Sequence, residues 1–74
     1  MAEIKINAQG LKCPMPIVKI SKGIKLMSVG DVLFVTSDDP AFKEDVKAFC
    51  NMTGNTLTAV TEAGGVFTAQ ITKK

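Results

Sequence analysis

The sequence predicts a two-layer α/β sandwich, in which two helices cover one face of a four-stranded sheet. Four short segments have the alternation or the β-branched composition of strands, and two segments carry apolar residues at helical spacing. Their order along the chain is β-α-β-α-β-β, which suits two layers. With 74 residues there is room for one hydrophobic core, so we expect a single domain over residues 1–74.

The first half of the chain predicts a strand, a helix and a second strand. Residues 3–7 alternate, with Ile4 and Ile6 on one face. A helix is expected from Pro14 to Met27, although Gly23 inside it costs up to about 1 kcal/mol relative to Ala. Its apolar face comprises Ile17, Ile20, Ile24 and Met27. After a turn at residues 28–31, the apolar run at 32–37 is the best candidate for a central strand.

The second half predicts a helix and a hairpin. Asp38-Asp39-Pro40 indicates a helix start, with an acceptor at the N-cap and proline in the first turn. Gly54 ends this helix. Strands are expected at 56–61 and 66–72, joined through Gly64-Gly65. The apolar stripe of the helix comprises Phe42, Val46, Phe49 and Cys50.

Composition excludes several classes of function. The net charge is only +2 and every basic residue is Lys, which is unlike a general nucleic-acid binder. No stretch is apolar enough to span a membrane, so we expect no membrane insertion and a cytoplasmic location. In that compartment the two cysteines are expected as free thiols. With no His and no glycine-rich nucleotide loop, we expect no metal and no cofactor.

Cys13 is the candidate reactive residue, because it lies where the first loop meets the first helix. We expect it at the N-cap, where unpaired N–H groups and the helix dipole favour a thiolate. Lys12 adds a positive neighbour. Between Ala8 and Gly30 there are four lysines and no acidic residue. The local field therefore favours a negative sulfur, although a purely structural role for a small residue at a helix start stays open.

The residues after Cys13 shape its surroundings. Pro14 and Pro16 stiffen the first turn, and they also remove two N–H donors. Only Met15 and Ile17 can then offer first-turn N–H groups. We therefore expect a moderately lowered thiol pKa, which suits a residue that both accepts and releases sulfur.

Other polar residues have simpler interpretations. Cys50 lies on an apolar stripe, which favours an inert buried thiol at the opposite end of the helical layer from Cys13. Asp38 and Asp39 are interpreted as caps rather than as catalytic carboxylates or metal ligands. Lys19 and Lys22 form either a solvated helix face or a docking surface for an acidic partner.

Several segments together resemble the TusA-like (SirA-like) sulfur carriers, over nearly the whole chain. The segment Gly10-Leu11-Lys12-Cys13-Pro14-Met15-Pro16 is similar to the Cys-Pro-x-Pro signature of that family. Further similar segments are Val29-Gly30-Asp31, Ser37 to Ala41 and Ala48-Phe49-Cys50. The resemblance implies a mixed sheet of order 1-2-4-3, as in the C-terminal domain of a translation initiation factor.

The resemblance also implies a function. Cys13 would accept sulfane sulfur as a persulfide, or as a thiosulfonate, from a cysteine desulfurase or a rhodanese. It would pass the sulfur to a reactive cysteine of an acceptor protein, in tRNA thiolation, cofactor synthesis or sulfur metabolism. Such a carrier is of the sulfurtransferase type and works with partner enzymes. We expect a monomer that does not bind nucleic acid directly.

Two other functions remain open. A regulatory or RNA-binding module is prompted by the factor-like fold and the basic first helix, and its RNA binding would depend on salt and not on Cys13. A thiol redox sensor would oxidise Cys13 to a sulfenic acid or a mixed disulfide. With no resolving cysteine nearby, such a sensor needs a partner thiol.

Overall fold

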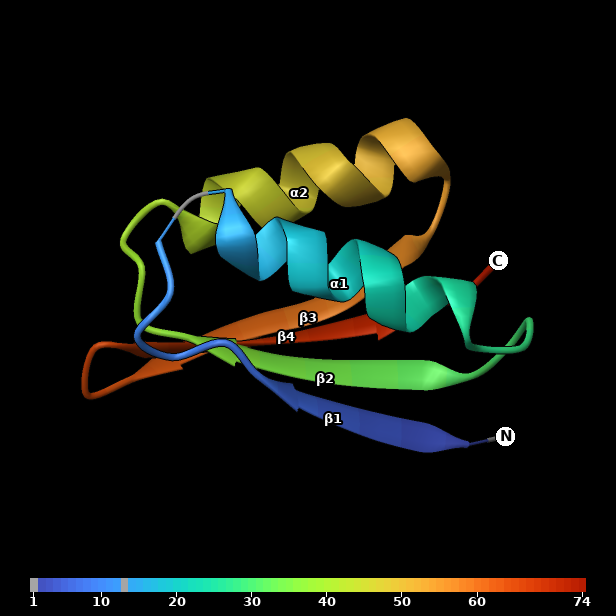
Figure 1. Ribbon diagram of the computed structural model, residues 1–74, viewed down its shortest axis with the longest axis horizontal. Coiled ribbons are helices and arrows are strands. Elements are labelled where there is room, and N and C mark those ends of the chain that lie inside the picture. The colour runs from blue at the N-terminus through green and yellow to red at the C-terminus, as the bar shows by residue number, and fades with distance from the viewer. Residues whose placement is uncertain (1, 13) are drawn as a thin grey trace.

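The computed structural model describes residues 2–12 and 14–74, and these form the predicted sandwich of two helices on one face of a sheet (Figure 1). The sheet has four strands in the order β1-β2-β4-β3, which confirms the expected order 1-2-4-3. Neither helix of the described part has the length and apolarity needed to cross a membrane. The elements are β1 (Glu3–Asn7), α1 (Met15–Lys25), β2 (Val32–Ser37), α2 (Phe42–Thr53), β3 (Thr56–Ala63) and β4 (Val66–Thr72).

Strand direction brings the starts of both helices to one end of the molecule. β1 runs parallel to β2, and β4 runs antiparallel to both β2 and β3. Each helix therefore connects two parallel strands, α1 between β1 and β2 and α2 between β2 and β3. Figure 1 shows both helices beginning at the same end of the sandwich, with the two chain termini at the other. The loops that leave β1 and β2 are consequently neighbours.

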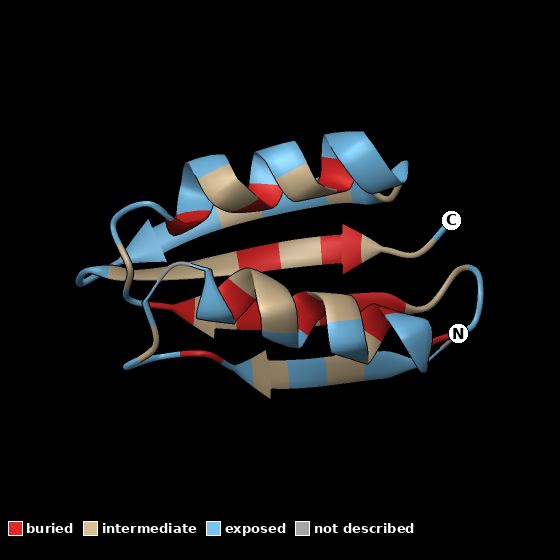
Figure 2. Cartoon of the chain, turned by 45° about the horizontal axis from the view of Figure 1, so that its top comes forward, coloured by how far each residue is buried: buried red, intermediate tan, exposed pale blue. Residues whose placement is uncertain are grey.

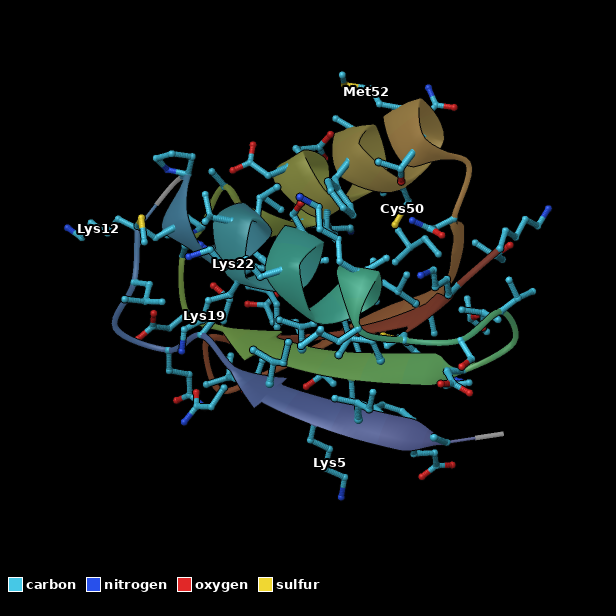
Figure 3. The ribbon with its side chains drawn as sticks, turned by 45° about the vertical axis from the view of Figure 1, so that its right-hand side comes forward. Lys5, Lys12, Lys19, Lys22, Cys50 and Met52 are labelled. Carbon is cyan, nitrogen blue, oxygen red and sulfur yellow. The ribbon has the colours of Figure 1, made fainter. Side chains whose placement is uncertain are left out.

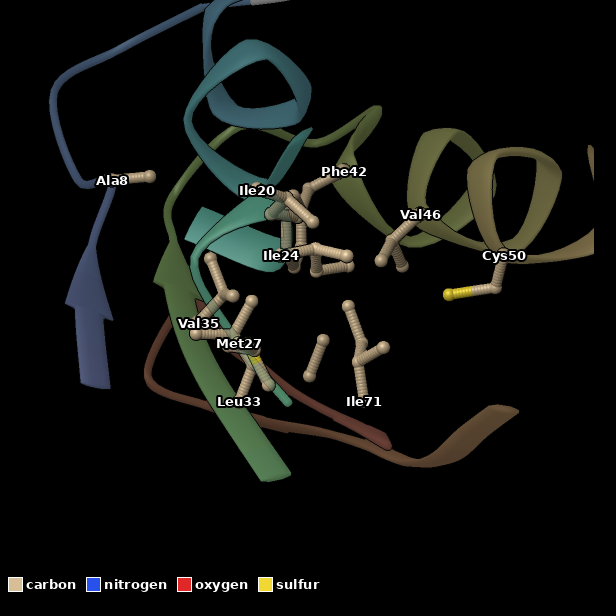
Figure 4. Close-up of a cluster of buried hydrophobic side chains, with 11 residues drawn as sticks. Ala8, Ile20, Ile24, Met27, Leu33, Val35, Phe42, Val46, Cys50 and Ile71 are labelled. Carbon is tan, nitrogen blue, oxygen red and sulfur yellow. The ribbon is translucent and has the colours of Figure 1, made fainter. Parts of the chain in front are cut away.

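The core lies between the helices and the sheet. Buried residues occupy the helix sides that face the sheet and several positions along the two central strands, β2 and β4 (Figure 2). The core is built almost wholly from aliphatic side chains, as a sequence with few aromatic residues predicts. The rings of Phe42 and Phe67 pack with their centroids 6.5 Å apart. The central cluster, shown in Figure 4, comprises Ala8, Ile20, Ile24, Met27, Leu33, Val35, Phe42, Val46, Cys50, Ala69 and Ile71.

α1 is shorter than the predicted span from Pro14 to Met27. Its last turn tightens, because the N–H groups of Leu26 and Met27 donate to the carbonyls three residues before them, at 3.1 Å each. The Nζ of Lys73 then donates to the carbonyl oxygens of Ile24 and Met27, at 2.8 Å each. A lysine at a helix C-terminus satisfies unpaired carbonyls and suits the dipole there.

The predicted start of α2 is wrong by about one turn. Ala41 is the N-cap, and Pro40 lies in a turn ahead of the helix rather than in its first turn. The Oδ1 of Asp39 accepts the N–H of Ala41 at 3.1 Å, and its backbone carbonyl accepts the N–H of Phe42 at 3.0 Å. The aspartate thus shapes the turn that leads into the helix. At the other end, Gly54 has φ +78° and ends α2 as predicted.

The hairpin of β3 and β4 turns at the predicted residues. Gly64 and Gly65 have φ of +58° and +81°, and a two-residue turn with both residues at positive φ matches the twist of the flanking strands. β3 extends to Ala63, two residues beyond the predicted end at residue 61. The register shifts between Leu57 and Ala59, so Thr58 forms a bulge in this edge strand.

Candidate functional site

The candidate reactive residue, Cys13, lies outside the described residues, so the site is built from its neighbours. Lys12 and Pro14 stand on either side of it, in the connection between β1 and α1. Lys12, Pro14 and Met15 are exposed, and the exposed fraction of Met15 is 46%. The described part of this segment therefore exposes one positive and two apolar side chains.

Ala8, Gly10 and Leu11 all help to hold the loop that leads to this segment. Ala8 is fully buried, and its N–H donates to the carbonyl of Thr36 at 2.7 Å. Leu11 packs against the core, with its N–H 3.3 Å from the carbonyl of Ala8. Between them, the N–H of Gly10 donates to Oδ1 of Asp38 at 3.0 Å. The last of these bonds is the one made to a side chain, and that side chain comes from the loop after β2.

The first turn of α1 differs from the prediction in two respects. The N-cap is Pro14 and not Cys13, because the helix begins at Met15. The N–H of Met15 donates to the carbonyl of Lys12 at 2.8 Å, so this predicted anion donor is already engaged. Ile17 carries the other first-turn N–H, since Pro14 and Pro16 have none.

Pro16 and Ile17 anchor the helix start, and the first turn carries no acidic side chain. Pro16 is fully buried in the second helical position, and Ile17 is half-buried against the core. The first turn has no acidic residue, and within the described residues no side chain caps it. Among the described residues, no side chain of the first turn therefore offsets the positive end of the α1 dipole.

The lysines of the first helix are spread along it, and Lys19 is nearer to its start than Lys22. In Figure 3, Lys12 and Lys19 stand at the end of the molecule where α1 begins, and Lys22 lies further along the helix. The Nζ of Lys19 donates to the carbonyl of Asn7 at 3.4 Å, and Lys22 is exposed in the last turn, where it also suits the helix dipole. A solvated face and a docking surface are both compatible with this placement.

Asp38 and Asp39 have roles that the sequence does not reveal. Both were predicted to cap α2, but Asp39 shapes the preceding turn and Asp38 joins the loop after β1. The loops after β1 and β2 border a cleft of about 390 Å³ beside Lys12. Its lining residues are Gly10, Leu11, Lys12, Asp38, Asp39 and Pro40. Across the described residues, no three His, Cys, Asp or Glu side chains gather to hold a metal ion.

Cys50 is the inert buried thiol that the sequence predicts. It is a free cysteine with 3% exposure, and burial raises the pKa of its thiol. A raised pKa keeps it protonated and unreactive at neutral pH. Figure 3 shows it at the far end of the helical layer from Lys12.

The sequence comparisons with known proteins agree with one another on one family. The model of the family described as sulfurtransferase TusA matches residues 4–73. Putative sulfur carrier proteins of Neisseria meningitidis serogroups A and B are 41% identical over 69 residues, which is 93% of this chain and 93% of each relative. The sulfur carrier protein TusA of Allochromatium vinosum is 43% identical over 63 residues, covering 85% of this chain and 83% of the relative.

A solved structure agrees with the fold. The crystal structure of a SirA-like protein from Desulfitobacterium hafniense superposes with a TM-score of 0.82 at 24% identity, covering 93% of this chain and 95% of the other. At that identity the likeness concerns the fold alone. The sequence matches cover almost the whole chain and include the Cys-Pro-Met-Pro segment, and from them it follows that the chain belongs to the TusA family.

Proposed function

We propose that this chain is a sulfur carrier of one domain, residues 1–74, whose acceptor atom is the sulfur of Cys13. The observation that carries the proposal is the match to the TusA family over residues 4–73, which includes Cys13 and its two prolines. The relatives from Neisseria meningitidis are named putative sulfur carrier proteins, and the relative from Allochromatium vinosum is named a sulfur carrier protein. The pathway supplied would be tRNA thiolation, cofactor synthesis or another branch of sulfur metabolism, in the cytoplasm.

The proposed chemistry is two successive thiol exchanges. The Cys13 thiolate attacks the terminal sulfur of a donor persulfide, forming one S–S bond as the donor S–S bond breaks and its thiolate leaves. The carrier then holds a persulfide on Cys13. An acceptor thiolate attacks the terminal sulfur of that persulfide, and Cys13 leaves as a thiolate. No net oxidation occurs, so the carrier needs no cofactor.

The surroundings of residue 13 support this chemistry. Both the thiolate and the persulfide are anions, and the uncapped start of α1 with Lys12 beside it favours a negative charge. Because the N–H of Met15 is engaged by Lys12, we expect a moderate lowering of the pKa of Cys13. A moderate value suits both attack on the donor and departure toward the acceptor.

Partners supply the specificity of such a carrier. We propose a cysteine desulfurase or a rhodanese as donor, and a protein with a reactive cysteine as acceptor. The exposed Pro14 and Met15 would contact the partner around the reacting sulfur, and Lys19 and Lys22 would face an acidic patch on it. A cargo carried as a thiosulfonate would use the same cysteine.

Intact mass after incubation with a cysteine desulfurase and cysteine tests the proposal. We expect a reducible gain of about 32 Da per sulfur on the wild type and none on Cys13→Ser. Cys50→Ala is the matched control, because it removes the buried thiol and should load normally. If no gain occurs, thiosulfate with a rhodanese is the second donor to test. Loading on Cys13→Ser, or failure with both donors, would contradict the proposal.

A further inference from the structure

We propose that Asp38 is a positioning residue for sulfur transfer, because its carboxylate fixes the loop that leads to Cys13 through the amide of Gly10. Only the choice of Cys13 as the acceptor rests on the proposed function. The bond itself joins two loops whose residues are 28 positions apart in the sequence, with 3.0 Å between the Gly10 nitrogen and Oδ1 of Asp38.

The Asp38 end of this bond is rigid. Asp38 follows Ser37, the last residue of the central strand β2, and Ser37 is fully buried. The Oγ of Ser37 accepts the N–H of Asp39 at 3.2 Å, so the backbone on both sides of Asp38 is held. Because its backbone is held, the carboxylate can restrain the loop after β1 rather than follow the motion of that loop.

The Gly10 end is the part of the loop that needs restraint. Ala8 and Leu11 are held by the core, but Gln9, Gly10 and Lys12 are exposed. Gly10 has φ +82°, a conformation that glycine adopts without strain and leaves just as freely. The carboxylate bond selects this conformation, three residues before Cys13.

Restraint matters more for transfer between proteins than for a reaction with a small reagent. A partner must meet Cys13 and the surrounding side chains in one arrangement, and ordering a loose loop lowers the rate of a productive encounter. A hydrogen bond contributes roughly 1 kcal/mol, which corresponds to about a five-fold change in the equilibrium constant between the ordered and the open loop. Alkylation by a small reagent has no such requirement.

Three substitutions separate the hydrogen bond from the charge. Asp38→Ala removes both, Asp38→Asn keeps an acceptor oxygen without the charge, and Asp38→Glu keeps the charge but displaces the oxygen. Glu44→Ala is the control, since it removes an equal charge from the first turn of α2. For each protein we would measure Gly10 amide exchange with water by NMR, and the rate of sulfur loading from a cysteine desulfurase.

We expect loading rates to follow the protection of the Gly10 amide and not the charge of residue 38. In Asp38→Ala the Gly10 amide should exchange about five-fold faster, and sulfur loading should be slower by up to about five-fold. In Asp38→Asn and Glu44→Ala both rates should stay within about two-fold of the wild type. Alkylation of Cys13 by iodoacetamide should change little in all of them. Because Cys50 is buried, its alkylation would reveal an unfolded variant.

Several results would overturn the inference. Equal Gly10 exchange in the wild type and Asp38→Ala would show that the bond restrains nothing. Loading rates that follow the charge, or that ignore Gly10 protection, would remove the positioning role. If Asp38→Ala is unfolded, the Gly10 exchange and the loading rates of Asp38→Asn and Asp38→Glu decide between the hydrogen bond and the charge. If the wild type takes up no sulfur, the proposed function fails, whereas the restraint is still judged by Gly10 exchange.

Discussion

Lys73 stabilises the end of α1 although it lies next to the end of the chain, and its side chain can be tested alone. Its backbone N–H and carbonyl are fixed separately, by Asp31 at 3.0 Å and by Gly30 at 2.9 Å. Lys73→Met keeps the apolar stem and the backbone bonds. It removes the two 2.8 Å bonds from Nζ to the carbonyls of α1.

The magnitude follows from those two bonds. Hydrogen bonds to a charged group contribute up to about 1.5–3 kcal/mol each, but Lys73 is only half-buried, so water can replace part of both. We therefore expect a loss of about 2 kcal/mol in total, including the interaction of the charge with the helix dipole. For a domain of this size, that loss lowers Tm by about 10 °C.

Urea denaturation followed by circular dichroism measures the effect on Lys73→Met. Lys74→Met is the matched control, because it removes the same charge from an exposed neighbouring side chain. The two midpoints should differ clearly while the slopes stay equal. A difference below about 0.5 kcal/mol in the free energy of unfolding between the two variants would refute the reasoning. It would mean that water hydrogen-bonds to the α1 carbonyls as well as Lys73 does.

Two further predictions concern Gly10 and Asp31. Gly10→Ala should destabilise the protein by about 1–2 kcal/mol in urea denaturation because of its φ of +82°, and no atom lies within 4 Å of the added Cβ. An unchanged midpoint would mean that the loop has moved to negative φ. The N–H groups of Ala2 and Ser28 donate to the Asp31 carboxylate at 3.0 Å each and hold its pKa below its usual range. This stabilisation is fully present above the unfolded pKa of about 4 and is lost as pH falls through the folded value. Wild type should therefore exceed Asp31→Asn in stability by a constant margin from pH 7 to 5, and the margin should shrink in more acidic solution; a margin that grows there would contradict the assignment.

Local patterns predicted most of the fold because they carry its main forces. The apolar spacing of α1 and the β-branched run of β2 describe burial, and burial decides which faces meet. Gly23 shows the limit of such patterns. Its sequence interpretation was a cost to the helix, but a Cβ there would lie 2.7 Å from Cδ1 of Ile6, so the glycine lets α1 approach β1 closely.

The features that the sequence did not reveal are contacts between distant residues. The bond from Gly10 to Asp38 and the bonds from Lys73 to α1 depend on how the loops and termini meet after packing. The same holds for the helix starts. Asp39 has a capping side chain at a suitable position, yet its carboxylate serves the turn at Ala41 and the helix begins at Phe42. Propensity finds a helix more reliably than its first residue.

The two ends of α1 differ in how they are stabilised, and this difference suits a sulfur carrier. The C-terminal carbonyls are satisfied by a charged side chain, at the end of the sandwich where both termini lie. The N-terminal turn has two prolines and no acidic residue, and within the described residues its anchor is the buried Pro16 rather than a polar cap. A capping carboxylate would stabilise the helix but would repel a thiolate or persulfide at residue 13. In the proposed function the start of α1 favours a sulfur anion, while Lys73 stabilises the far end of the helix, so Lys73→Met should lower stability without changing the sulfur loading of the folded protein.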